Sequence, residues 1–361
     1  MVPRFGRDCV TSLIPALLTP ESMEFKLLPD RVVESRATVV LVVDGLGWNQ
    51  LRDASRIAPV MSEMVGGPVT TVAPSTTAAA LTSIVTGTAP GEHGVVGYRI
   101  DVGGQVLNTL RWSTPRGDAR STIDPENFSQ VDPFLGERPV VVQNASFATS
   151  GFTRAHLRGV RHRGWRTLPT LAVEVRQALA AGESFVYAYY DGIDKIAHEF
   201  GFGEHYNAEM VAVDRLVTDL MMSLPRDAAL IVTADHGLVD CTGGKVELAD
   251  DVKRLVDRQS GEARFRWLHA TPGRSRDLLD AAVEAHGHQA WVTPVEQMVD
   301  EGWFGPVMSE VARSRIGDAA LVARDTNWFS DAADGGRIKL IGRHGSLTAD
   351  EMLVPMLSFV S

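Results

Sequence analysis

Three short apolar runs limit the fold of this chain more than any other feature of its sequence. They lie at residues 37–43, 184–190 and 228–234, and none of them alternates between apolar and polar side chains. Continuous apolar strands of this length are typical of a parallel sheet that is covered on both faces. A shorter run at residues 139–142 has the same character. We therefore predict an α/β fold, with a central mostly parallel sheet and helices on both faces.

The segments between these runs carry helical patterns. Residues 77–86 are rich in alanine and are followed by Gly87, and residues 170–181 are followed by Gly182. Glycine is common directly after the last residue of a helix, because it adopts left-handed backbone angles without strain. Residues 204–224 repeat apolar side chains at a spacing that gives one buried helical stripe. All three segments are predicted to be helices.

Two long segments interrupt this pattern, at about residues 99–166 and 242–335. The first is rich in Gly, Pro, Asp and Arg. The second has a mixed pattern of its own, with strands expected at 263–269, 289–293 and 319–323 and a helix expected at 276–285. We expect residues 1–361 to form one domain, in which the two insertions build a small α/β cap subdomain over the main sheet.

The charge balance narrows the classes of partner. The chain has 35 Lys and Arg residues against 45 Asp and Glu residues, so its formal net charge is −10. A protein that coats nucleic acid needs a broad basic face, and this balance argues against one. A small phosphorylated substrate held by a metal ion is compatible with it.

Cysteine content and hydropathy bear on the compartment. The two cysteines, Cys9 and Cys241, exclude a disulfide framework and a Cys-based zinc finger. No apolar segment has the length needed to span a bilayer. The apolar run at residues 9–18 is interrupted by polar residues and by Pro15, so we interpret it as a short helix rather than a secretory signal. We expect a cytoplasmic protein, because scarce cysteines fit a reducing compartment.

Acidic residues follow each of the three long apolar runs. They are Asp44, then Asp191 and Asp194, then Asp235. Ligands of open α/β sheets bind outside the carboxyl ends of the strands, so acidic side chains there are candidates for one site. Asp191 is interpreted as a helix cap without a ligand role.

Histidines accompany three of these carboxylates. The candidate set is Asp44, Asp194 with His198 four residues later, Asp235 with the adjacent His236, and His344 within a glycine turn. Residues four apart share one face of a helix. Taken singly, Asp44 is better explained as a cap at a strand-to-helix turn, Asp194 with His198 is a weak signal, and His344 fits a loop histidine, while the adjacent pair Asp235-His236 is more specific. Together they give three carboxylates and three imidazoles, a ligand set that suits zinc, with manganese or iron as alternatives.

A run of hydroxyl residues precedes the Ala-rich helix. Ser75, Thr76 and Thr77 follow Pro74 at its start. The dipole at a helix N-terminus favours an alkoxide or a bound phosphate, although Ser and Thr are also ordinary N-caps. One of these hydroxyls could serve as a nucleophile and as a seventh ligand to two metal ions.

In this order along the chain, the motifs resemble the alkaline phosphatase superfamily, and within it the nucleotide pyrophosphatase/phosphodiesterase branch. The matching segments are Asp44-Gly45, Thr77, the run Thr-Gly-Thr-Ala-Pro-Gly-Glu-His-Gly at 86–94, Asp194 with His198, Asp235-His236-Gly237, and His344-Gly345. The resemblance spans about residues 39–344, and the two insertions carry no recognisable motif of the branch. It implies an alkaline-phosphatase-like catalytic domain.

The resemblance also implies two divalent metal ions, usually both zinc, and a role for each residue. Asp44, Asp235 and His236 would bind one ion, and Asp194, His198 and His344 would bind the other. Members of the family place a threonine ten residues before the glycine of the Thr-Gly turn. Counting back from Gly87 gives Thr77 as the nucleophile between the two ions.

One position departs from the family pattern. The branch often has an asparagine after the His-Gly pair, and this residue helps to bind a phosphoryl oxygen. The matching position here is Tyr98, and the next residue, Arg99, is a second candidate for a phosphate contact. The departure concerns substrate preference and leaves the expected metal ligands intact.

The resemblance implies hydrolysis of phosphodiesters or nucleotide pyrophosphates through a phospho-threonine intermediate. A phosphomonoesterase or a phosphonate hydrolase on the same metal core is the alternative. A sulfatase is excluded because Gly117 stands where its signature requires arginine, in the segment Ser-Thr-Pro-Arg-Gly at 113–117. An alternative of another class is a non-catalytic protein that binds metal or phosphate on the same fold.

Overall fold

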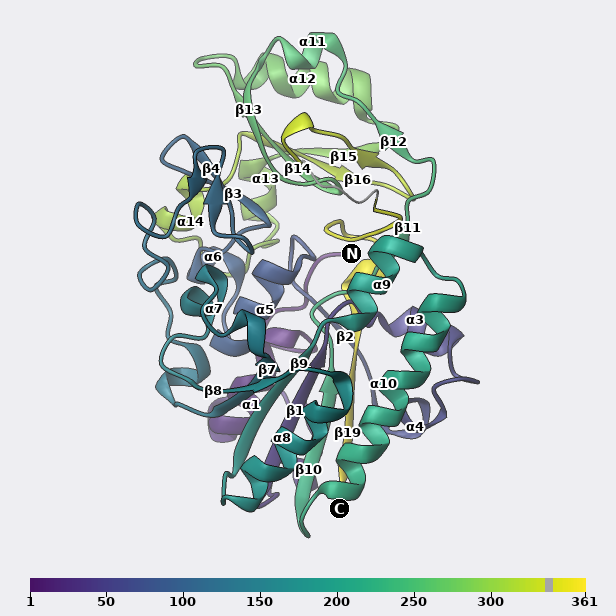
Figure 1. Ribbon diagram of the computed structural model, residues 1–361. Helices are drawn as coiled ribbons and strands as arrows, with labels where there is room; N and C mark the ends of the chain where they lie inside the picture. The colour runs from purple at the N-terminus through teal and green to yellow at the C-terminus, as the bar shows by residue number, and fades with distance from the viewer. Residues whose placement is uncertain (335–339) are drawn as a thin grey trace.

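The computed structural model describes residues 1–334 and 340–361, and its centre is a twisted sheet with helices on both faces (Figure 1). Within these residues the sheet has seven strands in the order β2-β19-β10-β1-β9-β7-β8. Their bounds are β2 Val65–Thr70, β19 Leu353–Val360, β10 Ala228–Thr233, β1 Ala37–Val43, β9 Phe185–Tyr190, β7 Val140–Asn144 and β8 Arg161–Trp165. The strands from β10 to β8 pair in parallel, and β19 runs antiparallel to both of its neighbours. The predicted α/β fold class is therefore confirmed.

Strand β1 lies at the middle of the sheet because nearly all of its side chains are apolar. Its residues from Val39 to Val43 have no exposed surface. Val39 pairs with Leu230 of β10 on one side and with Val186 of β9 on the other. Burial of apolar side chains on both faces stabilises a central strand and favours parallel pairing under helices. The carboxyl ends of β9, β1 and β10 therefore meet at one edge of the sheet.

Helices from different parts of the chain cover the two faces. α8 (Leu168–Ala180) and α10 (Glu204–Ser223) pack against each other on one face, and α1 (Leu13–Leu18) and α5 (Thr77–Thr86) pack on the other (Figure 1). α5, α8 and α10 agree with the predicted helices to within two residues at each end, and α1 begins four residues after the start of the apolar run at 9–18. Gly87 follows α5 with a left-handed φ of 71°, as a C-terminal glycine should.

The second predicted insertion forms a separate antiparallel sheet beyond the carboxyl ends of the central strands (Figure 1). Its strands, in spatial order, are β13 Val256–Glu262, β14 Phe265–Ala270, β16 Ala319–Ala323 and β15 Ala290–Pro294. Helix α12 (Ser275–His286) buries Leu278 against this sheet in a small core of its own. We call these elements, together with the small sheet described next, the cap.

The first predicted insertion, residues 99–166, is longer than the insertion that the structure shows. Only its beginning forms a separate small sheet, made of β3 Arg99–Val102, β4 Gln105–Asn108, β5 Ser113–Thr114 and β6 Gly117–Asp118. Strands β7 and β8 lie inside the predicted range but pair in the central sheet. β8 reads Arg-His-Arg-Gly-Trp and has an exposed edge, so it lacks the apolar signature of a buried strand.

Ion pairs join the small sheet to the larger sheet of the cap. The buried carboxylate of Asp101 in β3 accepts a hydrogen bond from Arg258 Nε in β13, and its Oδ2 lies 3.5 Å from His269 Nδ1. Arg99 Nη1 lies 2.8 Å from Asp331 Oδ2 and 2.6 Å from Asp334 Oδ1. The two insertions therefore contact each other as well as the central domain.

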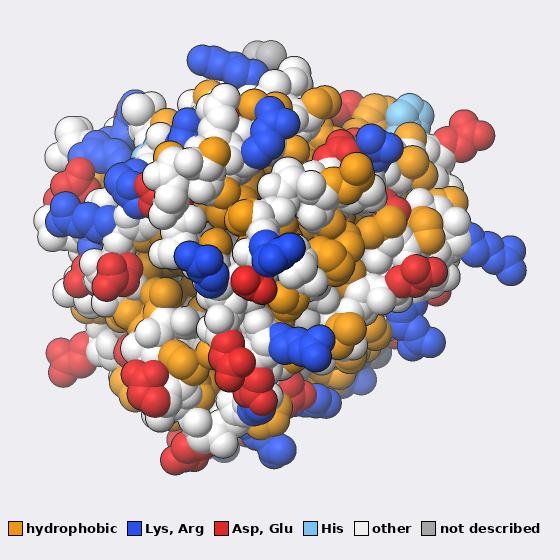
Figure 2. Space-filling view, turned by 90° about the horizontal axis from the view of Figure 1, so that it is seen from below, with side chains coloured by type: hydrophobic (Ala, Val, Ile, Leu, Met, Phe, Trp, Pro, Cys, Tyr) orange, Lys and Arg blue, Asp and Glu red, His pale blue; other side chains and the backbone are white. Residues whose placement is uncertain are grey.

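The opposite end of the molecule carries charges of both signs. Figure 2 shows this end, where Lys and Arg side chains alternate with Asp and Glu side chains around apolar patches. The helices in residues 1–334 and 340–361 include none with the length and hydropathy needed to cross a membrane.

Candidate metal centre

The carboxyl ends of β1, β9 and β10 bring the predicted acidic residues together. Asp44 follows β1, Asp194 lies in the first turn of α9 (Gly192–Phe200) after β9, and Asp235 follows β10. The Asp194 amide donates to the Asp44 carbonyl at 3.1 Å. Gly45 makes this close approach possible, because a side chain there would lie 3.0 Å from the Asp194 Cα, and its φ of 74° favours glycine.

One group of candidate ligands is fully buried. Asp44, Asp235 and His236 each offer one ligand atom, and these atoms lie within 4.8 Å of one another. His236 Nε2 lies 3.4 Å from Asp44 Oδ1 and 3.4 Å from Asp235 Oδ2. This trio agrees with the first ligand set that the family resemblance implies.

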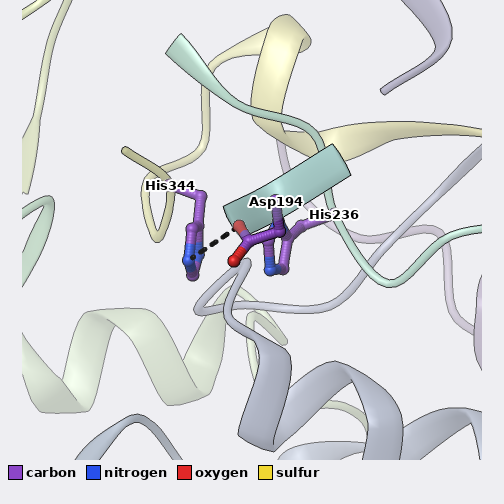
Figure 3. A group of neighbouring side chains, drawn as sticks. All are labelled: Asp194, His236 and His344. Atoms are coloured by element: carbon purple, nitrogen blue, oxygen red, sulfur yellow. Dashed lines mark ion pairs between the residues drawn. The ribbon is translucent and has the colours of Figure 1, made fainter. Parts of the chain in front are cut away.

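A second group lies next to it and is partly exposed. Asp194, His236 and His344 offer ligand atoms within 4.8 Å of one another, and Figure 3 shows the Asp194 carboxylate pointing toward the two rings. His344 Nε2 is 3.9 Å from Asp194 Oδ1, and the His236 and His344 rings stack with centroids 3.6 Å apart.

His198, expected in this second group, also approaches Asp194. Its Nε2 lies 3.3 Å from Asp194 Oδ1, and its ring centroid is 5.3 Å from that of His344. The structure thus brings all six predicted residues into one cluster, in which His236 stands between the two groups. Asp194, His198 and His344 are partly exposed, whereas the other three residues of the cluster are buried.

Backbone carbonyls fix the tautomer of all three histidines. The Nδ1 atoms of His198, His236 and His344 lie 2.6, 3.1 and 2.9 Å from the carbonyls of Gly342, Gly237 and Ser75. A carbonyl only accepts hydrogen bonds, so each neutral ring carries its proton on Nδ1 and keeps a lone pair on Nε2. This is the arrangement in which a carbonyl orients a histidine toward a metal ion.

The carboxylates show the same pattern of unused lone pairs. Asp44 Oδ1, Asp194 Oδ1 and Asp235 Oδ2 are buried and have no hydrogen-bond partner among the described residues. Each of them faces an imidazole Nε2 at 3.3–3.4 Å. A metal ion placed between these acceptors would bind the lone pairs on both sides, so these residues fit divalent metal ions.

The other oxygen of two of the carboxylates is held by the protein. Tyr189, in β9, donates its hydroxyl hydrogen bond to Asp44 Oδ2. Asp235 Oδ1 accepts from the amides of Gly45 at 3.1 Å and His236 at 3.0 Å. These contacts orient the unpaired oxygens toward the centre of the cluster. Tyr189 was not predicted, because a tyrosine in an apolar run gives no signal of its partner.

Burial and like charges perturb the ionisation of the cluster. Burial, and then the charges of Asp235 and Asp194, raise the pKa of Asp44 well above its usual range. Burial also raises the pKa values of Asp194 and Asp235. Burial and the neighbouring imidazoles lower the pKa of His344 well below its usual range. A bound cation would reverse the effect on the carboxylates, because it favours their charged form.

The structure distinguishes the three candidate hydroxyls. Ser75 Oγ donates to the Ser346 carbonyl at 2.6 Å and accepts from the Gly345 amide at 3.2 Å, so it joins the His344 loop to the start of α5. Thr76 occupies the N-cap position with an extended backbone. Thr77 is the first residue of α5, and its Oγ1 lies 3.1 Å from His236 Nε2.

The two predicted substrate contacts lie at the border of the cap. Tyr98 is half-buried, and its hydroxyl accepts a hydrogen bond from Asn108 Nδ2 at 2.6 Å. Arg99 is buried in its ion pairs with Asp331 and Asp334. In the described part of the chain neither side chain forms a hydrogen bond or an ion pair with the six clustered residues.

His93, in the quoted motif, has a structural position. It is fully buried, its Nδ1 accepts from the Val95 amide at 3.1 Å, and its Nε2 lies 2.8 Å from Ser83 Oγ in α5. Burial, with a smaller effect of the Arg315 charge, lowers its pKa to about 3. The ring is therefore neutral at physiological pH and ties α5 to the turn that follows it.

Comparison with protein families finds one match that covers most of the chain. The family described as type I phosphodiesterase / nucleotide pyrophosphatase matches residues 38–347. No curated protein matches the sequence at a significant level.

Several solved structures share the fold at low sequence identity. Murine ectonucleotide pyrophosphatase/phosphodiesterase 5 superposes with a TM-score of 0.67 at 16% identity, covering 90% of this chain and 88% of that chain. The human protein of the same name gives 0.67 at 18% identity, with the same coverage. Phosphonoacetate hydrolase from Sinorhizobium meliloti 1021 gives 0.66 at 18% identity, covering 90% of both chains.

Proposed function

Because the chain belongs to the type I phosphodiesterase / nucleotide pyrophosphatase family, we propose that it hydrolyses phosphodiesters or nucleotide pyrophosphates with two divalent metal ions and Thr77. Members of this family are hydrolases of phosphoester or phosphoanhydride bonds, and so is this chain. Its metal ions, its nucleophile and its substrate are the parts that we infer.

One observation carries the proposal: unpaired carboxylate oxygens face imidazole lone pairs directly beside a threonine hydroxyl. Asp44, Asp235 and His236 would hold one ion. Asp194, His198 and His344 would hold the other, with His236 close to both. Nitrogen and oxygen ligands of this kind suit zinc first, and manganese or iron as alternatives.

The proposed reaction has two steps at phosphorus. When bound, the two ions lower the pKa of the nucleophilic hydroxyl and stabilise the negative charge on the leaving oxygen. Thr77 Oγ1 attacks phosphorus, forms a phospho-threonine and expels the leaving group on the opposite side. Water then attacks the same phosphorus and restores the threonine. The backbone amides in the first turn of α5, which begins at Thr77, would donate to the phosphoryl oxygens.

The solved relatives support both the nucleophile and the substrate class. The murine phosphodiesterase is described as inactive in a variant with one threonine replaced by alanine, and this variant was solved with AMP. Such a ligand fits the proposal that a small phosphorylated molecule is the substrate here. The cap would cover the site within one catalytic domain.

A phosphonate hydrolase is the second candidate. The phosphonoacetate hydrolase was solved with phosphonoformate and with phosphonoacetate, and its fold is as similar as that of the phosphodiesterase. Tyr98 replaces the asparagine expected for a phosphoryl contact, so this position does not favour diesters.

A substrate panel with defined metals tests the proposal. The metal-free protein is reconstituted with zinc or manganese and assayed on bis(para-nitrophenyl) phosphate, para-nitrophenyl phosphate and phosphonoacetate. We expect the highest kcat/KM for the diester with zinc. Faster turnover of the monoester or the phosphonate would replace the proposed substrate class. Metal uptake without turnover of any substrate would indicate a binding protein.

A further inference from the structure

The cap places one unexplained acid next to the candidate site. Glu262 is the last residue of β13, and 8% of its surface is exposed. Both of its carboxyl oxygens are buried without a hydrogen-bond partner in residues 1–334 and 340–361. A buried carboxyl group without a hydrogen-bond partner destabilises a folded protein, so we looked for a role for Glu262 in the neighbouring site.

Glu262 contacts the loop that carries His344. A Cβ atom on Gly345 would lie 2.7 Å from Glu262 Cγ and 3.1 Å from its Cδ. The φ of Gly345 is 124°, in the region that favours glycine. Only a residue without a side chain therefore leaves room for Glu262 beside His344.

Two further segments of the site face the same carboxyl group. Burial raises the pKa of Glu262 to about 8, and the nearby Thr76 hydroxyl, Arg266 guanidinium and Tyr98 amide act in the opposite direction. Thr76 directly precedes Thr77. Tyr98 is the position at which the family pattern expects a phosphate contact.

These segments are already joined to one another. The Ser75 amide donates to the Gly345 carbonyl at 3.1 Å, and the Ser75 carbonyl accepts from His344 Nδ1 at 2.9 Å. The relative position of Thr77 and His344 therefore depends on the junction where Ser75, Thr76 and Gly345 meet. Glu262 closes this junction from the side of the cap.

We propose that Glu262 is a positioning residue, by which the cap holds the start of α5 and Tyr98 in register with the His344 loop. This role rests on the hydrolase function proposed above. In this structure neither donor forms a hydrogen bond with the Glu262 oxygens. Either protonation state of a carboxyl group can accept from them when the junction tightens around a bound substrate, so the role does not depend on its charge. Displacement of a nucleophile by about 1 Å costs on the order of 100-fold in rate, so a small shift at this junction would be measurable.

Two variants of similar size separate this role from simple packing. Glu262→Gln keeps an acceptor oxygen, and Glu262→Met fills the same space without one. Both avoid the cavity that alanine would leave. Glu284→Gln, at an exposed position of α12, is the matched control.

The experiment measures kcat, KM and zinc content on bis(para-nitrophenyl) phosphate. We expect Glu262→Met to lower kcat by roughly 10- to 100-fold with little change in KM or zinc content. Glu262→Gln should stay within about threefold of the wild type, because it keeps an acceptor oxygen for the Thr76 hydroxyl and the Tyr98 amide. If both variants keep the wild-type kcat, or if both lose the same factor in kcat, the positioning role is overturned.

Assays of the wild-type protein distinguish a failure of the positioning role from a failure of the proposed hydrolase function. Turnover by the wild type together with equal kcat in both Glu262 variants would overturn the positioning role alone. Zinc uptake by the wild type without any turnover would overturn the proposed function, and the positioning role with it.

Discussion

At the scale of single residues, the site is defined by the direction in which lone pairs point. Each imidazole has its Nδ1 held by a carbonyl, so that its Nε2 faces a carboxylate oxygen without a partner. A hydrogen-bonded core would place a donor between such acceptors. Thr77 Oγ1 lies 3.1 Å from His236 Nε2, and a comparison with the neighbouring Thr76 hydroxyl tests its role.

Thr77→Ala should lose on the order of 1,000-fold or more in kcat, because the nucleophile and one metal ligand disappear together. Thr77→Ser keeps a hydroxyl and should retain part of the rate. Thr76→Ala removes only the hydroxyl that faces Glu262, and that side chain makes no capping hydrogen bond. It should therefore lower kcat by no more than the roughly 10- to 100-fold expected for Glu262→Met. Steady-state kinetics of the three zinc-loaded variants measure these losses and identify the nucleophilic hydroxyl. An inactive Thr76→Ala beside an active Thr77→Ala would move the nucleophile by one residue.

At the scale of elements, apolar strands were predictable and polar ones were not. Strands β1, β9 and β10 agree with the predicted runs to within one residue, since burial on both faces requires a continuous apolar sequence. β8 is an exposed edge and carries no such signal. The pairing of β19 between β10 and β2 joins segments distant in sequence, and no local pattern encodes it.

The same limit applies to the candidate site. The six clustered residues and Thr77 stand in short motifs, and the structure brings them together, while their roles stay predictions. Tyr189 and Glu262 belong to no motif. They matter only through what they contact after folding, in a strand and a cap whose sequences look ordinary.

The contact between the two insertions supports a prediction for Asp101. It accepts from Arg258 and from the Gly104 amide at 2.7 Å, and it lies beside His269, whose Nε2 is 2.8 Å from Ser260 Oγ. Ser260, His269 and Asp101 have the order of a hydrolase triad, but Ser260 has no exposed surface, so the chain of contacts is structural.

Asp101→Asn should destabilise the protein by about 1–3 kcal/mol, because the charge of Arg258 then loses its buried partner. The midpoint of denaturant unfolding measures this. Asp118→Asn, which breaks an exposed ion pair with Arg120 in the same small sheet, should leave the midpoint unchanged. Similar midpoints for both variants would mean that the insertions do not stabilise each other through Asp101.

At the scale of the whole molecule, the candidate metal centre lies where the central sheet, α5, α9 and the cap meet. Its candidate ligands come from segments between Asp44 and His344, so metal binding would connect most of the chain. A ligand that binds only the folded state stabilises it, by about 2.7 kcal/mol at a concentration 100 times its dissociation constant. The size of this effect should depend on pH, because the ligands change protonation.

The sign of the pH dependence follows from the shifted pKa values. In the metal-free protein, burial raises the pKa values of Asp44, Asp194 and Asp235 above the ordinary value of 3.8. Their contribution to stability is present below that value and is lost as the pH rises through the raised values. Burial lowers the pKa values of His236 and His344 below 6.5, so their contribution is present above 6.5 and is lost as the pH falls.

Zinc binding requires deprotonated carboxylates and neutral imidazoles, so it should stabilise the protein more at higher pH. We expect the zinc-induced increase in Tm to be larger at pH 8 than at pH 6, because the metal-free state then holds buried carboxylate charges that only a cation offsets. Thermal unfolding of chelator-treated protein, with and without zinc, measures the difference at each pH. Asp235→Asn removes one of the buried charges and one ligand, so it should raise the Tm of the metal-free protein at pH 8 and reduce the response to zinc. A zinc response that is independent of pH, or equal in Asp235→Asn and the wild type, would contradict metal binding at this cluster.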